Sequence, residues 1–241
     1  MNEISSNKKQ YLVLAFILLS GLLIRLYFQV GHIFSDDAYY SFLSYSLSNG
    51  DFANDYLGYP VFPLRFGFIG LTSISMMIFG NTEFATIVFP FLFSLLNIVL
   101  TYKLALLITN DEKVALTSAL LITFFPTDII FATIGFPDLI NVFFIHLGIY
   151  FLLKSYLQKK FYLTYLGGIS FFLSMQFKEN AYYFLFLLIV LLVYFLVKKK
   201  QLVFQLLIGI IFIVGNYLLE GFIYLVLHND FLYRLTITNA N

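Results

Sequence analysis

The run FGFIGLTSISMMIF, from Phe66 to Phe79, decides how this chain is threaded. It is apolar, but its length of about 14 residues is below the roughly 20 residues that a helix needs to cross the hydrocarbon core of a bilayer. It either crosses the membrane or lies along its surface, and every later loop changes side with that choice. The positions of the basic residues distinguish the two arrangements.

The overall composition is that of a membrane protein. Of the 241 residues, 61% are hydrophobic and only 11% are charged, whereas soluble domains carry about 25% charged residues. A soluble fold of this length has no room for so much phenylalanine, leucine and isoleucine. The net charge of +1 argues against a nucleic-acid partner, and the lack of cysteine excludes disulfides and thiolate metal sites. The predicted fold class is an all-α polytopic membrane protein.

Seven other apolar runs are long enough to be candidate spans, the shorter ones with help from their flanks. They are Tyr11–Val30, Phe84–Ile108, Val114–Thr133, Leu139–Lys154, Phe161–Phe177, Ala181–Val197 and Leu202–Leu227. If Phe66–Phe79 does not cross, ten of the fourteen basic residues lie on the cytoplasmic side, as the positive-inside rule requires. If it crosses, Lys159, Lys160 and Lys198–Lys200 move outside. The charge distribution therefore predicts seven spans, with the N-terminus in the cytoplasm.

The first outer loop, residues 31–83, is then expected to carry two surface helices. Ala38–Ser48 has the apolar spacing of a helix on a membrane surface, and Asn49-Gly50-Asp51 is a turn that ends it. Phe66–Phe79 is the second helix. Between them, Tyr59–Pro63 is expected to be extended, because each proline disfavours the helical conformation of the residue before it.

Three regions follow from this topology. Residues 1–10 form a cytoplasmic tail that leads into a retained membrane anchor, since the first apolar run lacks a small-residue cleavage site. Residues 11–227 form the transmembrane core, which includes the outer loop. Residues 228–241 form an outer end.

Two adjacent aspartates, Asp36 and Asp37, stand at the entrance of the outer loop. Carboxylates are costly near a bilayer core and are seldom found there without a function. Aspartate is also a good N-cap, and one of the two is expected to cap the surface helix that follows. The other is a candidate for catalysis.

A further acid, Asp138, follows Pro137 at the outer end of the connection between the third and fourth spans. Proline and an acid near a helix N-terminus are both favourable, so this pair has a purely structural interpretation. The topology nevertheless brings Asp36 and Asp138 to one face of the membrane. Two carboxylates there could hold a divalent cation such as Mg²⁺ or Mn²⁺, or divide acid and base roles between them.

Few basic residues lie on the outer side. Lys178, beside Glu179, could extend its amine to the interface or could meet a phosphate. Arg25, inside the first span, and Arg65, at the start of the second surface helix, have the same two interpretations. Three polar residues lie inside predicted spans: His146, Asn216 and Glu220. Such groups are candidates for a functional role by default, although many of them only form packing hydrogen bonds between helices.

Taken in order, these residues resemble the GT-C superfamily of membrane glycosyltransferases. The most similar branches are the protein O-mannosyltransferases and the bacterial transferases that move aminoarabinose onto lipid A. The motifs that carry the resemblance are Arg25-Leu26, Asp36-Asp37-Ala38-Tyr39-Tyr40, Gly58–Leu64, Phe79-Gly80 with Glu83, Pro126, Pro137-Asp138 and Lys178-Glu179. The resemblance covers about residues 11–200, and its specificity lies in the order, spacing and common membrane side of the motifs.

The resemblance implies a seven-span core with two juxtamembrane helices in the first outer loop, as the charges also predict. It further implies a sugar donor linked to polyprenyl phosphate, inversion at the anomeric carbon and a first-loop aspartate as general base. That aspartate corresponds to Asp36, since Ala38 and Tyr40 then match the family pattern. We therefore expect Asp36 and Asp138 to be catalytic, with both as metal ligands if a cation is used. The residues expected to bind substrate are Asp37, Tyr40, Arg25, Arg65, Lys178 and Glu179.

The acceptor is expected to be a hydroxyl of a lipid, a glycan or a protein, and the location a prokaryotic plasma membrane. The chain departs from the family pattern at Phe62-Pro63, where relatives have two prolines, and it lacks a lysine found before that pair in some of them. Relatives are also usually longer, which leaves open a fragment, a minimal member or a part that needs a partner subunit. A transporter or flippase for a lipid-linked substrate, or a non-catalytic subunit, are the alternative functions.

Overall fold

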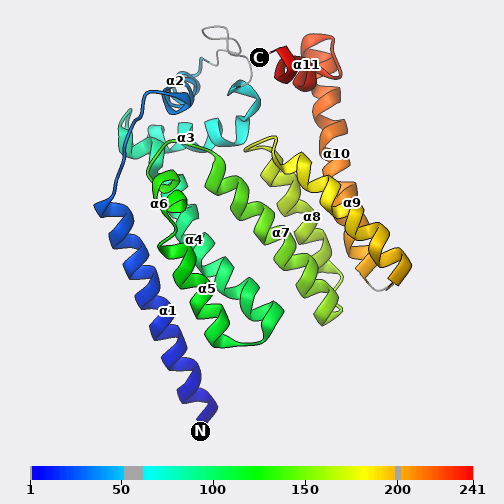
Figure 1. The fold of residues 1–241 in the computed structure, drawn as a ribbon. Coiled ribbons are helices and arrows are strands. Elements are labelled where there is room, and N and C mark those ends of the chain that lie inside the picture. Colours follow the sequence, from blue (N-terminus) through cyan, green and yellow to red (C-terminus); the bar gives the residue numbers. More distant parts are fainter. Residues whose placement is uncertain (1, 52–61, 199–201, 241) are drawn as a thin grey trace.

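The computed structural model describes residues 2–51, 62–198 and 202–240. Across these residues every regular element is a helix, and long apolar helices lie side by side while shorter ones cross one end (Figure 1). The elements are α1 (Asn2–Tyr27), α2 (Asp36–Ser48), the 3₁₀ turn η1 (Phe62–Leu64), α3 (Phe66–Phe79), α4 (Glu83–Thr109), α5 (Glu112–Thr123), α6 (Pro126–Ala132), α7 (Asp138–Gln158), α8 (Tyr162–Met175), α9 (Ala181–Lys198), α10 (Val203–His228) and α11 (Tyr233–Ala240).

The structure has a helix at each place where the sequence predicts a span. Within the described residues, α1, α4, α7 and α10 are each long and apolar enough to cross a membrane. The bent pair α5 and α6 passes the same test only when the two helices are taken together, which gives up to five candidate spans. Helix α8 and the described part of α9 are apolar but shorter. The protein is therefore an all-α integral membrane protein, and the number of seven spans stays a prediction.

The third predicted span is not continuous. The sequence predicts one helix over Val114–Thr133, whereas the structure has α5 and α6 joined at an angle of 58°. The break falls just before Pro126, which begins α6. Proline has no N–H to donate to the preceding turn, and its ring clashes with the carbonyl four residues earlier, so the prediction of an unbroken helix is wrong.

Helices α2 and α3 cross one end of the bundle, hereafter the α2/α3 end (Figure 1). Both helices are confirmed, and α3 has the predicted bounds. The Asn49-Gly50-Asp51 turn is also confirmed, with Gly50 N–H donating to the Leu47 carbonyl at 3.0 Å.

One local expectation fails. Phe62–Leu64 forms a 3₁₀ turn instead of an extended strand, because the φ angle that proline fixes suits this turn equally well. The remaining part of that stretch, Tyr59–Val61, lies outside the described residues. Helix α1 begins at Asn2, so the predicted tail is helical from that residue on, and its cytoplasmic location stays a prediction.

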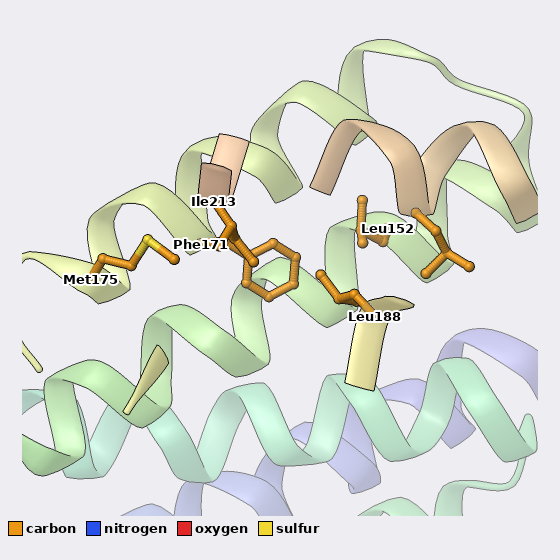
Figure 2. Close-up of a cluster of buried hydrophobic side chains, with 6 residues drawn as sticks. Leu152, Phe171, Met175, Leu188 and Ile213 are labelled. Carbon is orange, nitrogen blue, oxygen red and sulfur yellow. The ribbon is translucent and has the colours of Figure 1, made fainter. Parts of the chain in front are cut away.

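Apolar side chains join the helices into two packed groups. Leu14 and Ile17 of α1 meet Ile98 of α4 and Ala115 of α5 in one group. The other joins α7, α8, α9 and α10 around Phe171 (Figure 2). Phe171 of α8 approaches α7 closely because Gly148 stands opposite, where an added Cβ would lie only 2.6 Å from the ring. Close packing of this kind fixes the spacing between neighbouring helices.

A third apolar cluster holds α2 and α3 onto the bundle. Tyr40 and Leu43 of α2, Phe68 and Ile69 of α3, Ile140 of α7 and Phe177 are all buried together. Figure 1 shows the turn from α6 to α7, the turn from α8 to α9 and helix α11 at this same end. The connections from α4 to α5 and from α7 to α8 lie at the opposite end (Figure 1). Lys113 follows the first connection and Lys159 and Lys160 lie in the second, and all three are among the lysines predicted to be cytoplasmic. The α2/α3 end is therefore where distant segments bring their polar residues together.

Candidate active site

The two aspartates of the loop take different positions. Asp37 is fully buried, and its carboxylate accepts hydrogen bonds from the N–H groups of Ile33 and Ser35 at 2.8 and 2.7 Å and contacts His32 Nδ1 at 3.1 Å. Burial alone would raise the pKa of Asp37, but these bonds hold it below its ordinary value. Asp37 thus ties down the segment between α1 and α2, while Ser35 holds the N-cap position of α2.

Asp36, by contrast, is exposed in the first turn of α2. Its side chain lies one helical turn before Tyr40. The pKa of the Tyr40 phenol is raised, first by burial and also by the nearby charges of Glu179 and Asp36, and Arg65 only partly offsets this rise. The Asp36 carboxylate is therefore open to solvent, and its charge contributes to the raised pKa of Tyr40.

Three of the predicted binding residues meet in one cluster. Arg65, between η1 and α3, donates from Nε and Nη2 to the two carboxylate oxygens of Glu179 at 3.1 and 2.6 Å, and from Nη1 to the Tyr40 hydroxyl. The two planar groups therefore form a bidentate pair, the strongest geometry for these partners. The cluster joins α2, the start of α3 and the turn between α8 and α9.

Electrostatics keeps this cluster charged. Burial would lower the pKa of Arg65, but the bond to Glu179 raises it above its ordinary value. Burial would likewise raise the pKa of Glu179, but the hydrogen bonds and charge of Arg65 bring it below its ordinary value. Arg65 uses three of its five N–H groups in these bonds, and its guanidinium lies 5.7 Å from the Tyr40 ring centre.

A second ion pair is formed by Lys178, the residue before Glu179 in the chain. Lys178 Nζ donates to Asp138 Oδ1 at 2.7 Å, and both side chains are partly exposed. Asn141, one turn into α7, donates to the Ser174 and Lys178 carbonyls at 2.8 and 3.3 Å and so holds the turn after α8. The start of α7 and the turn between α8 and α9 are therefore fixed against each other.

Arg25 is not at this surface. It is fully buried and donates to Ser94 of α4, to the carbonyls of Gly21 and Thr123, and to Asp128 of α6. Its role in substrate binding stays a prediction, and in this structure its guanidinium ties α1 to three other helices.

Asp128 and Arg234 take part in buried ion pairs that sequence reasoning missed. Asp128 pairs with Arg25, and Arg234 of α11 pairs with Glu220 at 2.8 Å. Arg234 also donates to the Leu64 carbonyl at 3.0 Å. A signal was present for Asp128, since an acid two residues after a proline inside an apolar run invites a search for a cationic partner. Arg234 had no such signal, because α11 follows the last apolar run.

A metal site shared by Asp36 and Asp138 stays a prediction. Among residues 2–51, 62–198 and 202–240, no group of three or more histidine, cysteine, aspartate or glutamate side chains could hold an ion. Asp138 already has the Lys178 ammonium on one carboxylate oxygen. The positive charge beside Asp138 is therefore provided by the chain itself.

The middle of the chain matches the model of a known protein family. The model of the dolichyl-phosphate-mannose-protein mannosyltransferase family matches residues 67–219, more than half of the chain. No curated protein matches the chain. The matched segment contains Asp138, Lys178 and Glu179 and begins after Asp36 and Arg65. The chain belongs to the dolichyl-phosphate-mannose-protein mannosyltransferase family of GT-C membrane glycosyltransferases, which take a lipid-linked sugar donor.

Proposed function

We propose that the protein transfers a sugar from a polyprenyl-phosphate donor to a hydroxyl acceptor at the extracytoplasmic face of the membrane. One observation carries the proposal: Tyr40, Arg65 and Glu179 meet at the α2/α3 end, where Asp36 is exposed. Lys178, the residue before Glu179, pairs there with Asp138. A polyprenyl phosphate is amphipathic, so its sugar and phosphate lie at the interface while its tail stays in the hydrocarbon. The N-terminus and the end of the bundle opposite the α2/α3 end then face the cytoplasm.

Asp36 is the general base in this proposal. It accepts the proton of the acceptor hydroxyl as that oxygen attacks the anomeric carbon of the donor sugar. The bond between the anomeric carbon and the phosphate oxygen breaks at the same time, and polyprenyl phosphate leaves with the bonding electrons. Attack from the face opposite the phosphate inverts the anomeric configuration. The Asp36 carboxylate is exposed in the first turn of α2, so an acceptor hydroxyl can reach it.

Positive charge for the departing phosphate comes from Arg65 and Lys178. Both are cations held in place by acidic partners, Glu179 and Asp138, so they are oriented before the donor binds. The guanidinium fork of Arg65 also matches phosphate geometry. Tyr40 and Glu179 position Arg65, and Asp37 fixes the segment that carries Asp36.

A divalent cation, Mg²⁺ or Mn²⁺, shared by Asp36 and Asp138, would add positive charge near the phosphate. The step above does not depend on it, because Lys178 already donates to Asp138. Transfer measured after EDTA treatment, with and without added Mg²⁺ or Mn²⁺, tests this part of the proposal. Loss of transfer in EDTA with recovery on adding either ion supports a cation site, and full retention in EDTA contradicts it.

The central experiment is sugar transfer in membranes from polyprenyl-phosphate mannose to lipid, glycan or peptide hydroxyl acceptors, with wild type compared with Asp36→Asn. Removal of a general base is expected to lower transfer by about 10²- to 10⁴-fold. Asp51→Asn is the matched control, since Asp51 is an exposed aspartate of the same loop, outside the cluster, and its transfer should equal that of wild type. Undiminished transfer in Asp36→Asn refutes the base assignment. A wild type that is silent with every donor and acceptor refutes the proposed function and favours a non-catalytic subunit.

A further inference from the structure

Five polar side chains form a second network near the α2/α3 end, hereafter the outer network. It consists of Gln176, Tyr182, Asn216, Glu220 and Arg234. Gln176 donates to Asn216 at 2.8 Å, Asn216 donates to Glu220 at 3.4 Å, and Tyr182 donates to Glu220 at 3.1 Å. Arg234 then closes the network with bonds to both Glu220 carboxylate oxygens at 2.8 and 3.2 Å.

Three of the five members are buried, and the network joins three helices to the end of a fourth. Asn216 is 1% exposed, Arg234 6% and Glu220 8%. Its members come from α9, α10 and α11 and from the residue that follows α8. Buried charges are expensive unless paired, so the short α11 is held to α10 by a contact that costs much to break.

Both ends of the outer network reach the backbone on either side of Arg65. At one end, Arg234 Nη2 donates to the Leu64 carbonyl at 3.0 Å. At the other end, the Gln176 carbonyl accepts from Gly67 N–H at 2.9 Å. Gly67 allows this approach because an added Cβ would lie 2.7 Å from that carbonyl oxygen. Residues of one network therefore form hydrogen bonds to the backbone both before and after Arg65, at the Leu64 carbonyl and the Gly67 N–H.

We infer that Arg234 is a positioning residue: it holds the Leu64 carbonyl and thereby directs the Arg65 side chain toward Glu179 and Tyr40. Its charge is balanced by Glu220, so it brings no net charge to the site. Glu220 and Arg234 both follow the segment that matches the family model. The inference rests on the proposed function only where it concerns catalysis.

The geometric part can be tested without any transfer reaction. A single 3-fluorotyrosine at position 40 places a ¹⁹F nucleus beside the hydroxyl that Arg65 contacts. Arg65→Gln sets the resonance position for a Tyr40 that has lost this contact. Arg234→Gln is expected to move the resonance at least half of the way to that position. Thr236→Val is the control: it alters α11 by removing the hydroxyl that donates to Asp230 at 2.9 Å, and it should leave the resonance unmoved.

A second variant guards against loss of the fold. Arg234→Lys keeps the charge opposite Glu220 but has no guanidinium fork to span Glu220 and the Leu64 carbonyl together. Its resonance should move in the same direction by a smaller amount. The inference is wrong if folded Arg234→Gln protein keeps the wild-type resonance, or if folded Arg234→Lys protein does so where Arg234→Gln does not fold.

Transfer kinetics with polyprenyl-phosphate mannose give the catalytic part. If Arg65 contacts the donor phosphate, Arg234→Gln should raise the donor KM about tenfold to a hundredfold, since small misplacements of a binding group cost this much, and leave the acceptor KM unchanged. A purely structural role would lower the amount of active enzyme and change neither KM, which would contradict catalytic positioning. A moved ¹⁹F resonance together with a silent wild type would leave the positioning standing and refute the proposed function.

Discussion

The buried contact between Arg25 and Asp128 should be one of the strongest single determinants of stability in the bundle. Arg25→Met keeps an apolar stem of similar length and removes the guanidinium. Asp128, 5% exposed, would then keep Ser94 as its remaining hydrogen-bond partner among the contacts described here. The carbonyl of Thr123, at the end of α5, would lose the cation that lies 3.2 Å away.

The magnitude follows from the burial of both groups. Removing one partner of a buried ion pair leaves an uncompensated charge and costs about 3–5 kcal/mol. Asp128→Leu alone should cost a similar amount, because Arg25 is fully buried. The double variant Arg25→Met/Asp128→Leu leaves no unpaired charge, so its cost should be well below the sum of the two single costs.

The assay is the reversible free energy of unfolding in lipid bicelles for wild type, both single variants and the double variant. Ser20→Ala is the control, since Ser20 is a partly buried residue of α1 whose hydroxyl donates only within that helix among the described bonds, to the Phe16 carbonyl. The reasoning fails if Arg25→Met costs less than about 1 kcal/mol. It also fails if the two single costs add up in the double variant to within about 0.5 kcal/mol, which is the behaviour of independent sites.

Three further predictions concern the α2/α3 end. In a thermal unfolding assay, Gly67→Ala should destabilise the protein by about 1–3 kcal/mol because its Cβ would collide with Gln176. Gly70→Ala, with nothing within 4 Å of its Cβ, should instead stabilise α3 by up to about 1 kcal/mol. Equal effects of the two substitutions would contradict the close approach of Gly67 to Gln176. The pKa of Glu179 is below its ordinary value of 4.5, so the Arg65 pair stabilises the fold fully above about pH 5 and progressively less as the pH falls through 4.5 and then through the lower folded value. Unfolding temperatures of wild type and Glu179→Gln should therefore differ at neutral pH and converge in acid, and a constant difference down to pH 3 would be inconsistent with this account. Asp37→Ala should leave the N–H groups of Ile33 and Ser35 without their acceptor, which costs on the order of 2 kcal/mol and should speed proteolysis between α1 and α2; an unchanged cleavage rate would argue that the segment is held by other contacts.

Much of the architecture could be predicted from the order of residues. The apolar runs locate the long helices, since a run of about 20 apolar residues has few stable alternatives to a helix in a bilayer. The short length of Phe66–Phe79 separates α3 from the spans, and the structure gives this helix the predicted bounds. The bend at Pro126 could also have been expected from the chemistry of proline. Helix α11 could not, because its place depends on the contact of Arg234 with α10 and Leu64.

The site divides in the same way. The sequence by itself singled out Asp36, Arg65, Asp138, Lys178 and Glu179, because charged groups are rare in such an apolar chain and few of the cations are predicted to lie on the outer side. The family resemblance added Tyr40. The sequence could not say that Arg65 pairs with Glu179, that Lys178 pairs with Asp138, or that Arg25 turns inward to Asp128. Those choices depend on which helices pack together, and a pattern along one helix carries no information about its neighbour. Between the two adjacent aspartates, only the tertiary structure decided that Asp37 is buried among backbone N–H groups and that Asp36 is exposed, because the path of the chain from α1 to α2 fixes which carboxylate meets those donors.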